Sequence, residues 1–354
     1  MIFKTNTNKA KYLMLSIAFA TTSLVIAQET EEEEDITPKF SINGTVDAYF
    51  RTNLNAPNVG DNSKAPGSSF AQLPGFSLGM ANIITAYEGE KVGFVADLVF
   101  GPRGTDAIFN SPMYSATGNT VNQLYIYWNV NEKVTLTMGN FNTFLGYEVI
   151  SPAANFNYST SYLFSYGPFS HTGIKADFSL SEDFSAMIGV FNLTDLTEYN
   201  PTGIYAFGAQ LGYKGQYVNL LTDSGAYELD YTGGFSLSDS FYLGLNAAVY
   251  DNGGTGFAGV ALYPQLTTSD TFSLGLRGEF FVESGAYGAI DQIENGAADG
   301  SVFALTLTGS ASIGSLIIKP EIRIDNASDD SFLNTKFAPQ KSLSSFVLAA
   351  VYAF

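Results

Sequence analysis

Segments of about ten residues, in which apolar and polar side chains alternate, recur along most of the chain. Alternation with a period of two is typical of a β-strand that has two different faces. After residue 27, no apolar run approaches the ~20 residues that a membrane-spanning helix needs. In a membrane, such a chain can pair all of its backbone groups only as a closed barrel. The pattern therefore predicts an all-β, transmembrane, antiparallel up-and-down β-barrel. It has about sixteen strands, near residues 40–50, 75–86, 92–100, 121–129, 133–141, 170–179, 184–192, 204–213, 216–223, 226–235, 241–250, 256–263, 271–281, 301–310, 315–324 and 345–354.

The connections between these segments largely alternate between long and short. The long ones span 51–74, 101–120, 142–169, 193–203, 282–300 and 325–344, whereas the intervening ones are tight turns such as Lys214-Gly215. Outer-membrane barrels have long extracellular loops and short periplasmic turns. Two connections on the long side, near 224–225 and 251–255, are short. The sorting still favours a barrel over a β-sandwich and places both termini in the periplasm.

The two ends of the chain fit this interpretation. The last ten residues, SFVLAAVYAF, form an apolar strand that ends on Phe354, where a barrel's last strand would pair with its first. At the other end, three lysines precede an apolar stretch of about fifteen residues, 12–26, which predicts a signal peptide over residues 1–27. Residues 28–39 then form an acidic periplasmic leader, and residues 40–354 form the barrel.

Charge and composition exclude several classes of protein. The formal net charge of −18 becomes −21 without residues 1–27, which contain three lysines and no acidic residue. A chain so acidic is not expected to bind nucleic acid. The chain has no cysteine, which excludes disulfides and a lipid anchor on cysteine. Gly, Tyr and Phe are abundant, at 35, 21 and 29 residues, as in outer-membrane barrels.

The alternation also assigns faces to the strands. In residues 319–324, for example, the charged side chains fall on one face and Pro320, Ile322 and Ile324 on the other. A basic side chain facing lipid at mid-membrane costs ~2–4 kcal/mol, so the charged face is expected to line water. The predicted pore-lining residues are Asp47, Arg51, Asp97, Lys175, Asp177, Glu228, Asp230, Arg277, Glu279, Lys319, Glu321 and Arg323. Pro320 cannot donate a hydrogen bond to a strand ladder, and it predicts a bulge or a strand boundary there.

The third long connection, 142–169, is rich in aromatic residues, which is unusual for a solvated loop. Either it folds into the barrel and narrows the pore, or it packs on its neighbours at the rim. We favour the first alternative. The residues of this predicted constriction loop are Tyr147, Glu148, Phe156, Tyr158, Tyr162 and Phe164.

A cluster of short motifs begins with Gly139-Asn140-Phe141 and Gly146-Tyr147-Glu148. It continues through residues 155–159, 161–162, 166–168 and 171–173. Together these motifs resemble the OmpL-like group of β-barrel porins from Bacteroidota-type outer membranes. The resemblance implies an outer-membrane barrel through which small solutes diffuse, and it implies no catalytic residues.

Enzymatic and metal-binding functions find little support in the sequence. His171, the one histidine, is adjacent to Ser170, and neighbouring residues of a strand point to opposite faces, so the two are not expected to form a catalytic pair. No Cys/His cluster exists, and the acidic residues of 285–300 lack the spacing of a calcium loop. We therefore expect no enzyme, no cofactor and no metal site.

Three functional classes remain open. The first, which we favour, is a porin for passive diffusion of small polar solutes or ions, with mild cation preference because seven acids oppose five bases on the predicted pore wall. The second is a transporter of apolar compounds, and the third is a structural or adhesive barrel with a closed lumen. Expected partners are outer-membrane lipid, lipopolysaccharide, and the barrel-assembly machinery through the strand ending at Phe354. A homotrimer is considered by analogy of fold.

Overall fold

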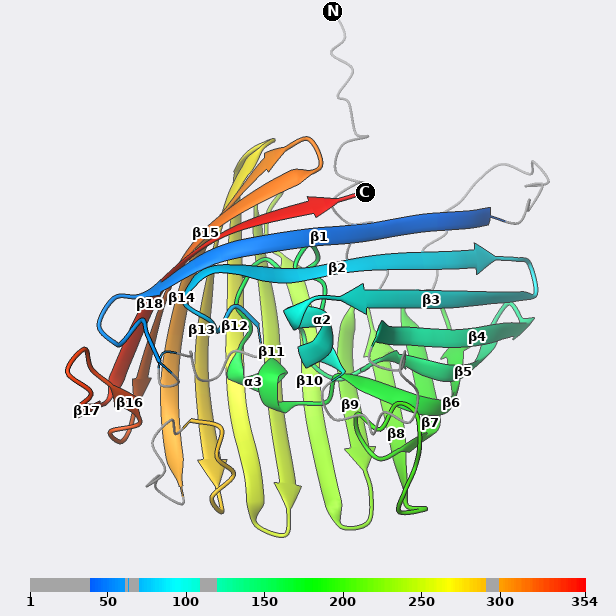
Figure 1. Ribbon diagram of the computed structural model, residues 1–354. Helices are drawn as coiled ribbons and strands as arrows, with labels where there is room; N and C mark the ends of the chain where they lie inside the picture. The colour runs from blue at the N-terminus through cyan, green and yellow to red at the C-terminus, as the bar shows by residue number, and fades with distance from the viewer. Residues whose placement is uncertain (1–38, 61–62, 64–69, 109–119, 291–298) are drawn as a thin grey trace, which may run out of the picture.

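The computed structural model describes residues 39–60, 63, 70–108, 120–290 and 299–354. Sixteen strands close into one antiparallel barrel (Figure 1), which confirms the predicted fold class. Its strands are β1 (Lys39–Asn53), β2 (Gly75–Glu88), β3 (Val92–Phe100), β4 (Val121–Asn131), β5 (Val134–Asn142), β6 (Ser170–Ser179), β7 (Phe184–Asn192), β8 (Tyr205–Tyr213), β9 (Gln216–Thr222), β10 (Ala226–Ser236), β11 (Phe241–Asn252), β12 (Thr255–Ser269), β13 (Phe272–Ser284), β14 (Gly300–Ile313), β15 (Leu316–Ala327) and β18 (Ser342–Ala353).

The barrel closes where β1 pairs with β18 over nine residue pairs, from Thr45 opposite Ala353 to Asn53 opposite Ser345. Gly44 and Phe354 extend this ladder, because each donates its amide N–H to the other's carbonyl, at 3.1 and 3.0 Å. The Phe354 ring covers Gly44 so closely that a Cβ there would lie 2.6 Å from it. Closure removes the free sheet edges that could not be tolerated in lipid.

The predicted alternation of connections is present. Long connections at one end of the barrel include the short helices α2 (Pro102–Ala107) and α3 (Tyr162–Tyr166), while the other end has only tight turns. A small sheet of β16 (Phe332–Leu333) and β17 (Pro339–Gln340), within the last long connection, was not predicted. Within the described residues, no helix has the length and apolar character needed to cross a membrane.

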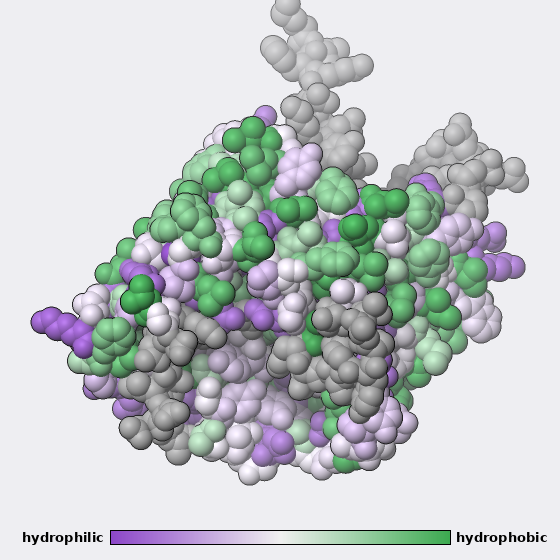
Figure 2. Space-filling view, viewed as in Figure 1, coloured by the Kyte–Doolittle hydropathy of each residue, from purple (hydrophilic) through white to green (hydrophobic). Residues whose placement is uncertain are grey.

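The two faces of the strands follow the period-two pattern. Along β10, Tyr227 and Leu229 are 43% and 46% exposed on the outer face, whereas Glu228 and Asp230 are 6% and 1% exposed on the inner face. Green hydrophobic side chains are spread over the outer wall in Figure 2, around β1, β2 and β3. The apolar face is therefore directed outward and the polar face inward, the inverse of a water-soluble barrel.

The expectation of a bulge at Pro320 was wrong. Pro320 lies inside β15, on the outer face, and the β14–β15 register is the same on both sides of it, with Thr308 opposite Glu321 and Ala311 opposite Ile318. Gly309 stands across from Pro320, and the proline ring reaches within 3.4 Å of where a Cβ on Gly309 would lie. A glycine partner thus leaves room for the ring without an inserted residue.

Two sequence predictions concern residues outside the described part of the chain. The predicted signal peptide, 1–27, and nearly all of the predicted acidic leader, 28–39, fall in the residues that precede β1. Both remain predictions.

Candidate functional site

The interior of the barrel is crossed by loop 142–169, the connection between β5 and β6. In the ring of strands, six lie between β6 and β13 on one side, and six lie between β5 and β14 on the other. β13 and β14 are therefore opposite the point where the loop leaves the wall. The loop makes hydrogen bonds to both of them, so it spans the lumen and contacts the far wall, which we define as β13, β14 and β15. Figure 1 shows α3, within the loop, inside the barrel.

Arg277 of β13 is the centre of the contact with the far wall. Its guanidinium forms a buried ion pair with Glu148 of the loop at 2.6 Å, and neither side chain is exposed by more than 3%. It also donates to the carbonyl oxygens of Ser159, at 2.6 Å, and Thr160, at 3.2 Å. A buried charge requires a partner and further hydrogen bonds, and the loop supplies both. Arg277 therefore holds two separate parts of loop 142–169.

Glu279, two residues along β13, receives the start of helix α3. Its carboxylate accepts the backbone N–H groups of Tyr162 and Leu163, each at 2.9 Å. These are among the amides that a helix leaves without an internal partner. Ser161 caps the same helix, because its hydroxyl accepts from the N–H of Phe164, and Glu148 in turn accepts from both the amide and the hydroxyl of Ser161 at 2.7 Å. The polar wall thus takes the place of water for this helix end.

β15 contributes three further anchors. Glu321 accepts the N–H groups of Tyr158 and Ser159 at 2.8 and 3.1 Å, and it also binds the Ser159 hydroxyl. Lys319 donates to the carbonyl oxygens of Pro152, at 2.8 Å, and Asn155. Arg323 donates to the carbonyl of Thr160 at 2.7 Å and is paired with Asp325 at 2.8 Å.

The loop is also bound to β1. The Tyr158 hydroxyl donates to the carboxylate of Asp47, which accepts the Met80 amide at 2.8 Å through its other oxygen. β1 and β2 shift register at this place, so that Asp47 faces two residues of β2 in a β-bulge. The Asp47 carboxylate accepts the backbone N–H of one of them, Met80. Gly79 is required there, because a Cβ on it would lie 1.7 Å from Asp47 Oδ2.

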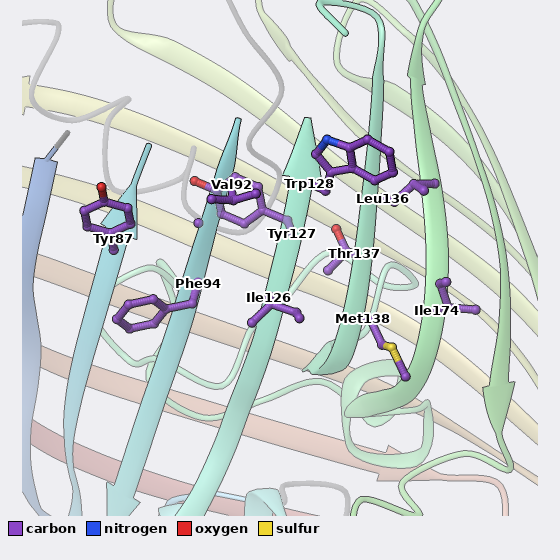
Figure 3. Close-up of a pocket in the computed structure, with 11 residues that line it drawn as sticks. Tyr87, Val92, Phe94, Ile126, Tyr127, Trp128, Leu136, Thr137, Met138 and Ile174 are labelled. Atoms are coloured by element: carbon purple, nitrogen blue, oxygen red, sulfur yellow. The ribbon is translucent and has the colours of Figure 1, made fainter. Parts of the chain in front are cut away.

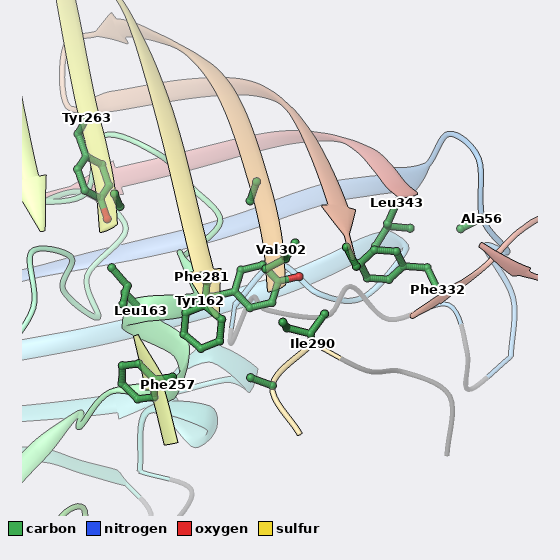
Figure 4. Close-up of a cluster of buried hydrophobic side chains, with 14 residues drawn as sticks. Ala56, Tyr162, Leu163, Phe257, Tyr263, Phe281, Ile290, Val302, Phe332 and Leu343 are labelled. Atoms are coloured by element: carbon green, nitrogen blue, oxygen red, sulfur yellow. The ribbon is translucent and has the colours of Figure 1, made fainter. Parts of the chain in front are cut away.

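The aromatic side chains of the loop pack against the wall. Tyr147 stacks on Tyr263 of β12 with ring centroids 4.3 Å apart. The Phe156 ring occupies the notch left by Gly275, and a Cβ there would lie 2.2 Å from the ring. Phe164 packs on Phe169 at 4.9 Å. Figure 4 shows Tyr162 and Leu163 among the inward-facing residues of β12 to β14, in a core that is formed inside the barrel.

The wall from β1 to β6 is polar but differs in kind from the far wall. Asp97 of β3 accepts from the side-chain amides of Asn82, at 3.1 Å, and Asn122, at 2.7 Å. Asn122 accepts from Asn140 through its backbone carbonyl, and Asn140 accepts from Thr172 of β6. Neutral amides and hydroxyls therefore connect five strands around the Asp97 carboxylate.

The twelve predicted pore-lining residues all face the interior, and ten of them are buried under polypeptide. Lys175 and Asp177 of β6 are the two partly exposed members, at 23% and 27% of their side chains, and they pair with each other at 2.9 Å. Arg51 binds the first long connection through the carbonyls of Ser63 and Gln72. The buried members are Asp47, Arg51, Asp97, Glu228, Asp230, Arg277, Glu279, Lys319, Glu321 and Arg323. Loop carbonyls and amides, in place of water, solvate much of the wall.

His171 also faces the interior, where its Nε2 lies 2.9 Å from the Thr143 hydroxyl. The imidazole is 1% exposed and packs between Phe144 and Phe191, with centroids 5.1 and 5.0 Å away. His171 therefore packs against Thr143 and Phe144, where loop 142–169 leaves β5.

The sequence analysis missed several polar residues of the interior, among them Asp325, Arg103 and Asp195. Asp325 continues the alternation of Arg323, but the predicted strand ended at residue 324. Arg103 of α2 donates to the carbonyls of Ile150 and Tyr158, at 3.2 and 2.8 Å, and no periodicity marked it. Asp195 accepts the amides of Phe169 and Ser170, both at 2.8 Å, and lies in the fourth long connection.

Asp195 holds the C-terminal end of loop 142–169. Burial raises the pKa of its carboxyl to about 6, and the two backbone hydrogen bonds only partly oppose this effect. The Asp195 carboxyl is therefore expected to change its charge near pH 6.

An apolar pocket of about 380 Å³ lies on the outer wall (Figure 3). Exposed side chains such as Phe94, Ile126, Met138 and Ile174 line it, from strands β3 to β6. It opens toward lipid and is separate from the interior site.

Comparison with known families agrees with this geometry. A family model described as "Putative beta-barrel porin-2, OmpL-like" matches residues 39–354. The chain belongs to this family. As an OmpL-like porin, it is an outer-membrane channel protein of a Gram-negative bacterium. None of the curated proteins compared with it matches in sequence.

Solved structures resemble this OmpL-like porin in fold. A loop-deletion mutant of OmpT from Vibrio cholerae has a TM-score of 0.51 at 11% identity, over 90% of this chain and 99% of that one. An anion-selective porin from Comamonas acidovorans also has a TM-score of 0.51 at 11% identity, over 90% of this chain and 100% of that one. At this identity the likeness concerns the fold of the barrel.

Proposed function

We propose that loop 142–169 forms the narrowest part of the water path and that small polar solutes and ions pass beside it. The observation that carries this proposal is the crossing of the lumen by the loop, which reaches Arg277 and Glu279 on the opposite wall. A porin interior of this size encloses water unless a segment fills it. The partly exposed pair Lys175–Asp177, in the half of the barrel near the tight turns, supports a water-accessible path there.

The charges of the interior support a preference for cations. On the inner wall, the seven acidic residues of the predicted set exceed the five basic ones, and Glu148, Asp195, Glu283 and Asp325 add four acids against one base, Arg103. The bases Arg51, Arg277, Lys319 and Arg323 share β1, β13 and β15 with acids, whereas Asp97 on β3 and Glu228 and Asp230 on β10 have no base on their own strands. An excess of acids along the path favours cations. The anion selectivity named for the Comamonas protein belongs to that protein.

Burial of the loop aromatics argues against the apolar-transport hypothesis. Tyr158 and Tyr162 are fully buried against the wall, so their rings are not available to an apolar solute. We also propose that the chain has no enzymatic activity and needs no cofactor. Arg277, Glu279 and Glu321 make stable contacts with polypeptide instead of presenting reactive groups.

Further proposals concern the partners. Lipid and lipopolysaccharide would contact the apolar outer face, and the barrel-assembly machinery would recognise the strand that ends at Phe354. A solved structure of Vibrio cholerae OmpT is described as a trimer form, and we extend a homotrimer to this chain as a proposal. Mass measurement of the detergent-solubilised protein tests it, and a monomeric mass would contradict it.

Conductance in a planar bilayer tests the channel proposal. The folded, full-length protein is inserted under a KCl gradient, and stable current steps are expected with a reversal potential shifted toward that of K⁺. A reversal potential toward Cl⁻ would contradict the cation preference. Silence from protein shown to be folded and inserted would contradict an open path, and the structural-barrel hypothesis would then replace it.

A further inference from the structure

Glu228, near the long-loop end of β10, is a buried carboxylate without a partner. It is 6% exposed, and it makes no hydrogen bond or ion pair within the described part of the chain. The charges that act on it are those of Asp230 and Asp195, and both are negative. An isolated buried charge is unfavourable unless it is paired. Glu228 is therefore a buried carboxyl group with no counter-charge among the described residues.

Neighbouring carboxylates of the interior do not share this condition. Asp230 accepts from the amide of Gly146 at 3.1 Å and from Asn219 at 2.6 Å. Asp195 accepts two backbone amides, and Glu283 accepts the amide of Ala289 at 2.6 Å. Each of these groups accepts at least one hydrogen bond from the protein. Glu228 accepts none within the described residues.

The surroundings of Glu228 are aromatic. Tyr250 is its direct cross-strand neighbour on β11. The Tyr250 ring lies 6.0 Å from that of Tyr287, which lies 6.0 Å from that of Tyr166 in loop 142–169. All three rings are half-buried. On the loop side, a Cβ on Gly167 would lie 3.7 Å from Glu228 Oε1, so the carboxylate faces the backbone just after α3. The Tyr287 hydroxyl donates to the Tyr166 carbonyl at 3.1 Å, which fixes these two rings.

We propose that Glu228 with Tyr166, Tyr250 and Tyr287 forms a binding site for the ammonium group of a small organic cation. This tyrosine–carboxylate site would select the class of solute that the porin takes up, and it rests on the proposed channel function. A carboxylate supplies the opposite charge, and aromatic faces attract an alkylated ammonium through their quadrupoles. A metal ion fits less well, because no group of three His, Cys, Asp or Glu suited to a metal occurs in the described ranges.

Direct binding to the folded protein in detergent tests the proposal without requiring conduction. The probe is tetramethylammonium chloride, observed by saturation-transfer NMR at constant ionic strength against NaCl. The wild type is expected to give a saturable signal with a dissociation constant of about 10 mM or tighter. Glu228→Gln is expected to weaken binding at least about tenfold, and Tyr250→Leu roughly two- to fivefold.

Asp239→Asn is the matched control, because it removes the same charge from an exposed tight turn at the other end of the barrel. It should bind as the wild type does. Equal affinity of Glu228→Gln and wild type, or a wild-type signal that rises without saturation, would overturn the site. Heat-modifiable electrophoretic migration confirms that each variant is folded. Tetramethylammonium binding together with a silent bilayer would retain the site and reject the open channel, so the two proposals fail separately.

Discussion

The far wall, β13 to β15, and the wall at β10 both carry buried charge, but they use it differently. On the far wall, Arg277, Glu279 and Glu321 are each bound to loop 142–169 by a charged side chain or by backbone groups. At β10, Asp230 accepts one loop amide, and Glu228 accepts none within the described residues. The comparison indicates that most interior charges are structural anchors, and that a charge left without a protein partner is the better candidate for contact with a solute.

Loss of the central anchor should have the largest effect. Arg277→Ala leaves Glu148 buried without its partner, which costs about 3–5 kcal/mol in the free energy of unfolding. The loop should detach from the far wall, and single-channel conductance should rise severalfold. Lys214→Ala, at an exposed ion pair beside a tight turn, is the control for removing a positive charge. Unchanged conductance in a folded Arg277→Ala protein would mean that the loop does not limit the path.

Asp195 provides a pH-dependent anchor at the C-terminal end of loop 142–169. Its pKa in the folded protein is raised to about 6 by burial, from 3.8. The folded state therefore binds the proton more tightly, and this stabilisation is fully present below pH ~4 and is lost as pH rises through about 6. The free energy of unfolding should fall over this window by roughly 3 kcal/mol at most. Urea unfolding of the wild type and of Asp195→Asn at pH 4 and pH 7 measures this change. If both proteins lose the same free energy of unfolding between the two pH values, another group causes the pH dependence.

The contrast between Glu279 and Glu228 can be tested by paired substitutions. Glu279→Gln weakens the acceptor for the Tyr162 and Leu163 amides and unbalances Arg277, so the free energy of unfolding should fall by about 1–3 kcal/mol. Glu228→Gln removes an unpaired charge and should leave it unchanged or raise it. Urea unfolding in the same detergent compares them. A larger loss for Glu228→Gln would mean that a protein partner neutralises Glu228.

The smallest effect is expected at the contact with β1. Tyr158→Phe removes the hydroxyl that donates to Asp47 but keeps the ring, so unfolding should be easier by about 0.5–1.5 kcal/mol. Conductance should stay near that of the wild type, because Arg277 still holds the loop. A conductance change as large as that of Arg277→Ala would move the main anchor from the far wall to β1.

Much of the barrel was accessible from sequence because a strand in a membrane must be apolar on one side. That requirement located all sixteen barrel strands and assigned side chains such as Arg277 and Glu321 to the inner face. The same requirement gave no prediction for segments that lack periodicity. Arg103 lies on a short helix in a connection, and the β16–β17 pair is only two residues per strand. Pro320 misled the analysis because the glycine that accommodates its ring, Gly309, lies on the neighbouring strand β14.

The sequence by itself determined the barrel, its outward apolar face, the sorting of its loops and the inward direction of its charges. These follow from local alternation and from the cost of polar groups in lipid. Only the tertiary structure decided which inward charges meet a partner. Glu148 and Arg277 are 129 residues apart, and a loop from β5 reaches β13 only because closure places these strands opposite each other. The same closure places Tyr250, Tyr287 and Tyr166 near Glu228, an arrangement that no spacing in the sequence indicated.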